Sequence, residues 1–359
     1  MITYRIKSLQ KHIENSAEAF MITSDVNRFY FTGFSSSAGC VLITKNNAYL
    51  LVDFRYGEAA EKVVKHCKVV VFQKLTDSIK DICSEENIKE ISVEQESVTL
   101  AQAESYKKAF RKFGVALSHS KLLDALINNL RIVKTDDEIK LIKMAQQITE
   151  EAYTEVLNYV KPGVTEREIA LELEYLMRKK GADGVSFSLI TITGSNTSLP
   201  HGVPGDNVIK EGDFFLSDIG ALYQGYHSDM TRTVAVHHAT DEMHKIYNIV
   251  LDAQLKALSA VKPGEKACDI DKTARDIITQ AGYGDNFGHS TGHGVGLDIH
   301  EQPTLSIKSD VILSAGMVIT IEPGIYLPDK FGVRIEDTVA VTKNGCENLA
   351  KIDKSLIIV

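Results

Sequence analysis

The sequence predicts an α/β domain followed by a larger α+β domain that is built from two similar halves. Three observations support this prediction. The chain of 359 residues is long for one domain. Its first 120 or so residues alternate short apolar runs with helical patterns, and its remainder repeats itself after about 100 residues. We place the boundary between about 120 and 135 and divide the chain into 1–125 and 126–359.

The first domain is expected to contain a largely hydrophobic sheet with helices between its strands. Apolar runs predict strands, and apolar residues at helical spacing predict helices. The expected strands are 19–24, 39–44, 47–53, 68–73 and 89–94, and the expected helices are 59–67, 75–87 and 99–114. A long helix then begins near Asp136 and ends at Pro162-Gly163, a strong stop signal.

The second domain carries an internal duplication. The segment 160–163 (VKPG) recurs 101 residues later as 261–264, and 233–236 (TVAV) recurs 105 residues later as 338–341. Two single residues between them, Ile169 and Gly181, recur at the first of these offsets. Each half reads helix, Pro-Gly break, helix and then strands, which predicts two similar halves that meet at a cleft.

Composition excludes several classes of function. A net charge of −8 argues against nucleic-acid binding, which needs a dense positive surface. No apolar run approaches the roughly 20 residues that span a bilayer, and the first residues lack the apolar core of a signal peptide. The five cysteines are scattered and form no Cys-x-x-Cys pair, so neither a disulfide framework nor a zinc knuckle is indicated. We expect a cytoplasmic protein that binds neither nucleic acid nor membrane.

Two pairs of acids flank predicted hairpins. Asp218 and Asp229 fall opposite each other if the first turn centres on Tyr223-Gln224, and like charges there repel unless something positive binds. A slip that leaves both acids in water is the alternative. In the second half, Glu322 and Glu336 flank a similar hairpin, and Glu322 lies in an apolar strand where an unpaired charge is costly.

Histidines accompany these acids. His289, His293 and His300 lie within one glycine-rich stretch of twelve residues, and His201 occupies the matching loop of the first half. A lone loop histidine usually only forms hydrogen bonds, but three beside four acids indicate a site. Carboxylates with imidazole favour Mn²⁺ or another octahedral cation. Four carboxylates are too many for one divalent ion, so we expect two metals roughly 3.5–4 Å apart.

These motifs resemble those of the pita-bread metallopeptidases, the family of methionine aminopeptidase, aminopeptidase P, prolidase and creatinase. The similar segments are 218–233 (DIGALYQGYHSDMTRT), 292–301 (GHGVGLDIHE), 319–326 (ITIEPGIY) and 333–337 (VRIED). NRFYFTGF (27–34) and LVDFRY (51–56) resemble the N-terminal domain of the prolidase, aminopeptidase P and creatinase branches. The resemblance covers nearly the whole chain and implies a homodimer.

The resemblance also implies roles for individual residues. Asp218 would hold one metal, His293 and Glu322 the other, and Asp229 and Glu336 would bridge the two. Glu322 would also handle the proton of the attacking water. His201 and His300 would stabilise the oxyanion, His289 would line the substrate side, and Arg334 would orient nearby acids. The metals are expected to be Mn²⁺, with Co²⁺ or Zn²⁺ as alternatives.

The substrates implied are short proline-containing peptides, cut at the bond before proline. Prolidases often carry an arginine just after the His-Glu-x-Pro segment, where this chain has Thr304 and where Lys308 is the nearest cation downstream. We favour an Xaa-Pro dipeptidase, with an aminopeptidase P acting on longer peptides as the alternative. A binding module that has lost its metals, and a creatinase-like enzyme, are disfavoured because all five ligand positions are present.

Overall fold

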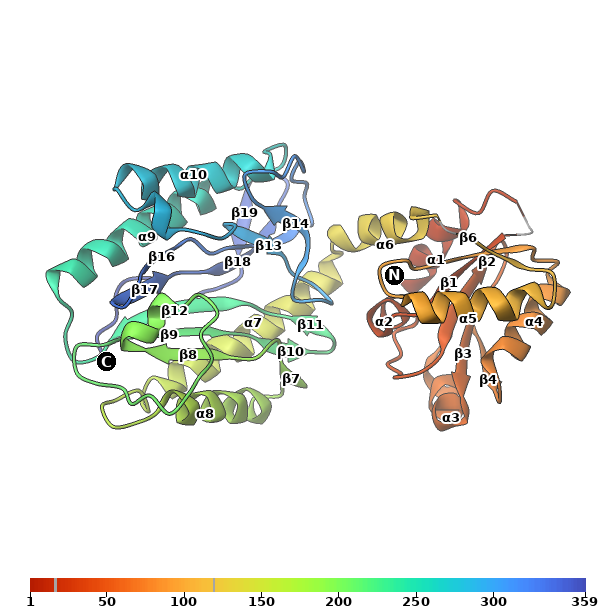
Figure 1. The fold of residues 1–359 in the computed structure, drawn as a ribbon, viewed down its shortest axis with the longest axis horizontal. Helices are drawn as coiled ribbons and strands as arrows, with labels where there is room; N and C mark the ends of the chain where they lie inside the picture. Colours follow the sequence, from red (N-terminus) through yellow and green to blue (C-terminus); the bar gives the residue numbers. More distant parts are fainter. Residues whose placement is uncertain (16–17, 119) are drawn as a thin grey trace. The chain divides into compact units, whose positions relative to one another are not determined.

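The computed structural model describes residues 1–15, 18–118 and 120–359. The described chain divides into two compact units, Met1–Arg131 and Ile132–Val359, whose elements are labelled in Figure 1. Among the residues described, no helix has both the length and the apolar character needed to cross a membrane.

The first unit is built on a mixed six-stranded sheet in the order β4-β3-β2-β1-β5-β6. Strand β2 is antiparallel to both of its neighbours, and the other adjacent pairs are parallel. The elements are α1 (Ile2–Gln10), β1 (Glu18–Ile22), α2 (Asp25–Thr32), β2 (Cys40–Thr44), β3 (Ala48–Asp53), α3 (Phe54–Val63), β4 (Lys68–Phe72), α4 (Leu75–Glu85), β5 (Glu90–Val93), α5 (Leu100–Arg111), β6 (Ala116–Ser118) and α6 (Leu122–Ile132). The five strands expected from the sequence are present, whereas α1, α2, α6 and β6 were not anticipated.

The second unit contains the duplicated halves. Its elements are α7 (Asp136–Val156), α8 (Glu166–Lys179), β7 (Gly184–Val185), β8 (Ile190–Thr193), η1 (Gly194–Ser198), β9 (Phe214–Ile219), β10 (Ala221–Tyr223), β11 (Tyr226–His227), β12 (Met230–Ala235), α9 (Asp241–Ala260), α10 (Ala267–Gln280), η2 (Gly284–Asn286), β13 (Gly292–Gly294), β14 (Glu301–Leu305), β15 (Val318–Ile321), β16 (Gly324–Leu327), β17 (Phe331–Arg334), β18 (Asp337–Val341) and β19 (Cys346–Asn348). The sheets run β12-β9-β8 and β11-β10-β7 in the first half, and β14-β13-β15-β18-β19 and β16-β17 in the second.

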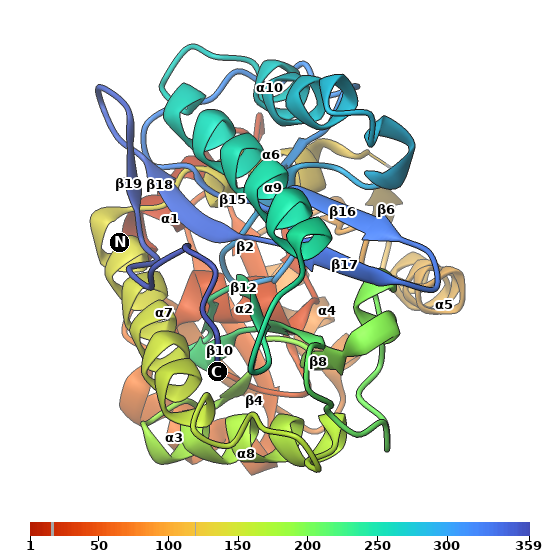
Figure 2. The ribbon, with the colours of Figure 1, turned by 90° about the vertical axis from the view of Figure 1, so that its left-hand side faces the viewer.

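Each half has its own hydrophobic core between a helix pair and its strands. Helices α7 and α8 pack with β9 and β12, and helices α9 and α10 pack with β15 and β18. The two helix pairs therefore cover opposite sides of the strands, as both views of this unit show (Figures 1 and 2). This layering leaves strands of both halves adjacent in the middle of the unit.

The duplication is visible in the backbone as well as in the sequence. Gly163 lies between α7 and α8, and Gly264 lies between α9 and α10; their φ angles are 96° and 91°. Helix α7 nevertheless ends at Val156 rather than at the predicted Pro162-Gly163. A turn from Val156 to Tyr159 precedes the break, because the residue before a proline disfavours the helical conformation and the chain must already be extended there.

Candidate metal centre

Strands from both halves carry the five candidate ligands. Asp218 lies in β9 and Asp229 directly precedes β12. His293 lies in β13, Glu322 directly follows β15, and Glu336 lies between β17 and β18. The ligand atoms of Asp229, His293 and Glu336 all fall within 4.8 Å of one another. Residues that are up to 107 positions apart thus share one small region.

The first hairpin differs in register from the prediction. Asp218 pairs with Thr231, so Asp229 is a diagonal neighbour of Asp218 rather than its direct partner. The turn centres on Gln224-Gly225, one residue later than expected, because both residues adopt positive φ angles of 49° and 82°. That combination is the two-residue type I′ turn that matches the twist of paired strands. Side chains two residues apart in a strand point to the same face, so both acids still lie on one face of the hairpin despite the change in register.

The second hairpin opens at its two acids. Ile321 pairs with Asp337 on one side, and Gly324 pairs with Arg334 on the other. Continuing that register places Glu322 opposite Glu336. The main chain separates there, because the Glu322 N–H donates to Thr291 O at 2.8 Å and the Glu336 N–H donates to Thr231 O at 3.1 Å. Each glutamate is therefore held by a residue outside its own hairpin.

His293 is oriented toward the acids by its own backbone. Its Nδ1 lies 3.0 Å from Gly294 O, and since a carbonyl only accepts, Nδ1 carries the proton. The other nitrogen, Nε2, lies 3.5 Å from both Asp229 Oδ2 and Glu322 Oε1. Burial lowers the pKa of His293 and favours the neutral ring. Nε2 thus offers a lone pair to a cation, as a metal-ligating histidine requires.

The carboxylates form a buried, negatively charged cluster that fits divalent cations. Burial, and then the charges of Glu336, Asp218 and Glu322, raises the pKa of Asp229 well above its ordinary value. Burial followed by the charges of Glu322 and Asp218 does the same to the pKa of Glu336. Asp218 Oδ1 is buried without a hydrogen-bond partner among the described residues. An orphaned oxygen beside mutually repelling carboxylates is the arrangement that a bound cation stabilises.

Arg334 orients two of the candidate ligands. Its Nη2 lies 2.6 Å from Asp218 Oδ2, and its Nε donates to Thr231 Oγ1 at 3.1 Å. The Thr231 hydroxyl in turn donates to Glu336 Oε2 at 2.7 Å. Arg334 Nη1 also donates to the Tyr326 hydroxyl at 2.8 Å. These contacts hold one oxygen of each carboxylate in place and leave the other available.

The remaining predicted histidines gather around this centre. His289 Nδ1 bonds to Ser290 O at 2.8 Å, so Nε2 accepts from the Tyr326 hydroxyl at 2.9 Å. The His300 ring lies 4.5 Å from the His293 ring, nearly perpendicular to it. Burial, followed by the charge of His293, lowers the pKa of His300, while the charge of Asp218 opposes this shift and that of His201 adds to it. His201 and His300 are both exposed.

Sequence reasoning missed three residues that support the site. Thr231 and Tyr326 stand inside the quoted motifs, but nothing in their spacing indicated that each would bridge two site residues. Lys134 forms a buried ion pair with Glu301, the residue after His300, at 2.9 Å. Lys134 precedes Glu301 by 167 residues, so only the fold shows this contact. Thr304 lies in β14, and Lys308 is exposed beyond it.

This geometry agrees with the comparisons with known proteins. Residues 140–343 match metallopeptidase family M24, and residues 5–133 match the creatinase/prolidase N-terminal domain. The chain therefore belongs to metallopeptidase family M24 and has its pita-bread fold. Among curated relatives, the Xaa-Pro dipeptidase of Pyrococcus horikoshii is 41% identical over 346 residues, which cover 96% of this chain and 95% of the relative.

Two solved structures are also similar to this chain over nearly its full length. An Xaa-Pro dipeptidase from Bacillus anthracis superposes with a TM-score of 0.95 at 40% identity, and the match covers 100% of both chains. An X-Pro aminopeptidase from Thermotoga maritima superposes with a TM-score of 0.90 at 36% identity, with 98% of this chain and 100% of the other covered. Enzymes named for both of the expected activities are thus similar to the chain over its full length.

Proposed function

We propose that this protein is an Xaa-Pro dipeptidase that uses two divalent metal ions to hydrolyse the peptide bond before proline. The convergence of four carboxylates and His293 Nε2 from both halves carries the proposal. Relatives named Xaa-Pro dipeptidase over nearly the full chain support it. The ions supply Lewis acidity and an activated water when bound. An oxygen-rich site favours Mn²⁺, with Co²⁺ or Zn²⁺ as alternatives.

The candidate ligands divide between the two ions. Asp218 would hold one ion, since Arg334 pairs with only one oxygen of its carboxylate and leaves the other without a hydrogen bond. His293 and Glu322 would hold the other ion, and Asp229 and Glu336 would lie between the two and be shared by them. Four carboxylates around one ion would leave two or more charges unbalanced in a buried site.

Other side chains handle the substrate and the proton. Burial raises the pKa of Glu322, opposed by His289 and Arg334, and a carboxyl with a raised pKa is suited to accepting the proton of the attacking water. His201 and His300, both exposed beside the acids, stabilise the oxyanion. His289, held by Tyr326, lines the substrate side, while Arg334 keeps the acids oriented.

Metal content and peptide length test this function. The metal-free protein should lack activity, and restored activity should follow two ions per chain; a fully active preparation with one tightly bound ion would refute the two-metal assignment. Ala-Pro should be cleaved well. A strong preference of the wild type for Ala-Pro-Ala would assign the protein as an aminopeptidase P instead, which is the second candidate because Thr304 supplies no cation and the Thermotoga maritima relative is named an X-Pro aminopeptidase.

Lys308 is proposed to receive the free carboxylate of a dipeptide. A dipeptide ends directly after proline, so a site that prefers it needs a cation there. Lys308→Ala should weaken turnover of Ala-Pro and leave Ala-Pro-Ala unchanged. Lys161→Ala, which removes an exposed lysine between α7 and α8, is the matched control. Equal loss with both peptides would contradict the proposed contact.

The assembly and location of the protein are part of the same proposal. We propose a homodimer, as the family resemblance implies, and sedimentation of the purified protein measures this directly. The five cysteines are all free, which suits a reducing cytoplasm. We also propose that 1–125 is an accessory N-terminal domain and that 126–359 is the catalytic domain, because every candidate site residue lies in the latter.

A further inference from the structure

Equivalent residues of the two halves meet each other beside the candidate metal centre. The offset of 105 that relates 233–236 to 338–341 also relates Thr231 to Glu336 and Arg232 to Asp337. The Thr231 hydroxyl donates to Glu336 Oε2 at 2.7 Å, and Arg232 Nη2 lies 2.8 Å from Asp337 Oδ1. Strands β12 and β18 therefore meet as symmetry-related partners, and the chain has a local pseudo-two-fold axis between them.

A second pair of contacts obeys the same pseudo-symmetry. The Thr233 hydroxyl donates to Arg334 O at 3.0 Å, and the Thr338 hydroxyl donates to Asp229 O at 2.8 Å. Thr338 follows Thr233 by 105 residues, and Arg334 follows Asp229 by 105 residues. The joint thus repeats the same bond on both sides of its axis.

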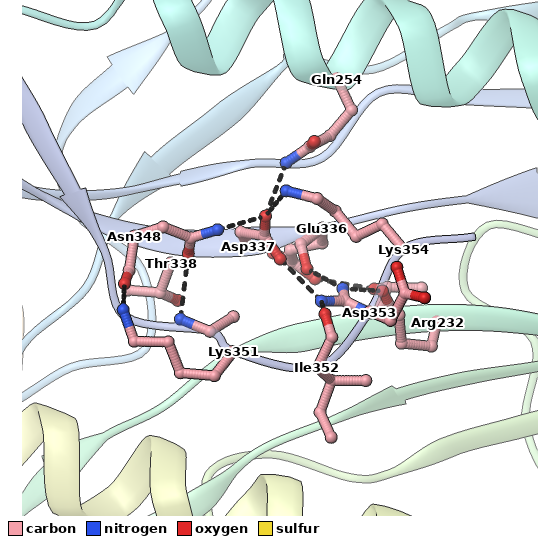
Figure 3. Close-up of polar contacts among 12 residues, drawn as sticks. Arg232, Gln254, Glu336, Asp337, Thr338, Asn348, Lys351, Ile352, Asp353 and Lys354 are labelled. Carbon is pink, nitrogen blue, oxygen red and sulfur yellow. Dashed lines mark hydrogen bonds and ion pairs between the residues drawn. The ribbon is translucent and has the colours of Figure 1, made fainter.

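The ion pair at this joint is fully buried and highly connected. The Asp337 side chain is 0% exposed and that of Arg232 is 2% exposed. Asp337 Oδ2 accepts from Gln254 Nε2 at 3.0 Å, from Asn348 Nδ2 at 2.8 Å and from the Lys354 ammonium (Figure 3). The donors come from α9, β19 and the C-terminal segment, so one carboxylate joins several elements.

Arg232 connects this ion pair to a candidate ligand. Its Nη1 donates to Glu336 O at 2.5 Å and to Thr231 O at 2.9 Å. Its Nη2 also donates to Ile352 O at 3.1 Å (Figure 3). The guanidinium therefore holds the main chain of Glu336 from behind, while Thr231 holds its N–H and its carboxylate.

We propose that Arg232, Asp337 and Lys354 form a positioning cluster that fixes Glu336 for metal binding, with the C-terminal segment 352–354 as part of it. The inference rests on the proposed function, in which Glu336 bridges the two ions. An apolar joint would bind the halves together without the cost of burying charges. Charged partners instead fix one geometry at Glu336, because the planar guanidinium of Arg232 must meet the Glu336 carbonyl and the Asp337 carboxylate at the same time.

The variants that test this cluster act at its partly exposed end, where the Lys354 side chain is 15% exposed. Lys354→Met removes one charged donor, whereas Lys354→Arg keeps the charge. Lys351→Met is the matched control, because Lys351 lies in the same segment but its ammonium bonds to Asn348 O rather than to Asp337. Isothermal titration of each metal-free protein with Mn²⁺ gives the affinity, and circular dichroism together with the thermal midpoint reports folding.

We expect Lys354→Met to weaken Mn²⁺ binding by about 10- to 100-fold, the usual effect of losing a group that orients a metal ligand. Lys354→Arg should restore most of the affinity, and Lys351→Met should bind as the wild type does. Arg232→Met should have a larger effect; because it removes a wholly buried charge and can prevent folding, the Lys354 variants decide the matter.

Two outcomes would overturn the inference and are distinguishable. Wild-type Mn²⁺ affinity in a folded Lys354→Met, with or without a lower thermal midpoint, would show that the cluster only stabilises the fold, and the proposed function would stand. A wild type that binds no divalent metal would instead refute the proposed function, and this inference with it.

Discussion

Among single residues, Thr231 and Tyr326 each connect Arg334 to another residue of the site through one hydroxyl group. The Thr231 hydroxyl accepts from Arg334 and donates to Glu336. The Tyr326 hydroxyl accepts from Arg334 and donates to His289 Nε2. Each hydroxyl therefore has a defined direction, which fixes the free oxygens of the acids and the tautomer of His289.

His300 provides a prediction at this scale. His300→Ala should lower kcat by about 10²–10³, because an oxyanion donor contributes about 2.7–4 kcal/mol to transition-state stabilisation. The metal content should stay unchanged, since His293 rather than His300 directs its nitrogen toward the acids. Steady-state kinetics and metal analysis of the purified variant measure both. His244→Ala, an exposed histidine of α9, is the control, and loss of metal from His300→Ala would make His300 a ligand.

At the scale of elements, the Pro-Gly turns join the helices of each pair. A Cβ added at Gly163 or Gly264 would meet no atom within 4 Å, so steric space does not require glycine at either position. The positive φ angles do require it, because side chains disfavour that backbone conformation. Equivalent turns in the two halves thus impose the same backbone constraint by the same means.

Gly163→Ala and Gly264→Ala should therefore destabilise the protein to a similar extent. Each should lower the free energy of unfolding by about 1–2 kcal/mol, the cost of a side chain in left-handed backbone. Gly345→Ala is the control, because its added Cβ also meets nothing and its φ angle is not positive. Urea unfolding measures all three, and a Gly345 variant as destabilised as the others would contradict the backbone explanation.

The sequence was more informative about elements than about their edges and contacts. Apolar runs such as 40–44 marked buried strands, because burial on both faces removes polar residues. Helix α1 was missed because Arg5, a buried cation stacked on Tyr30, interrupts its apolar face. The register at Asp218 was wrong by two because a single-residue shift of the turn moves every pairing. The duplication made it possible to predict the four carboxylates from the sequence. Lys134 could not be predicted, because only the folded chain brings it to Glu301.

At the scale of the whole molecule, the excess of acidic residues and the most deeply buried thiols are found in different units. Residues 131–359 carry 33 acidic against 23 basic residues, and the metal candidates are among them. Cys40, Cys67 and Cys83 lie in the first unit. Burial raises the pKa of each of these three thiols to about 12, with smaller contributions from neighbouring charges at Cys40 and Cys83. The most shielded thiols and the candidate metal ligands therefore belong to different units of the chain.

These thiols should resist alkylation while the protein is folded. The thiolate is the reactive form, so a pKa near 12 lowers the reactive fraction at pH 8 by about 10³ relative to a free cysteine. Their reactivity should stay low as the pH rises from 7 to 9, and it should appear on unfolding in urea. Mass spectrometry after timed iodoacetamide treatment measures each site. Rapid folded-state labelling of Cys40 at pH 8 would contradict the burial argument.

The joint between the halves has a consequence for how this chain can change over generations. The first half supplies Asp218 and Asp229, and the second supplies His293, Glu322 and Glu336, so neither copy holds a complete site. In this chain the two halves contact each other through equivalent positions: Thr231 meets Glu336, and Arg232 meets Asp337. A substitution at Arg232 removes the ion-pair partner of Asp337, and one at Thr231 removes a hydrogen-bond donor to Glu336. Changes in the two copies are therefore coupled at the joint, where equivalent positions contact each other.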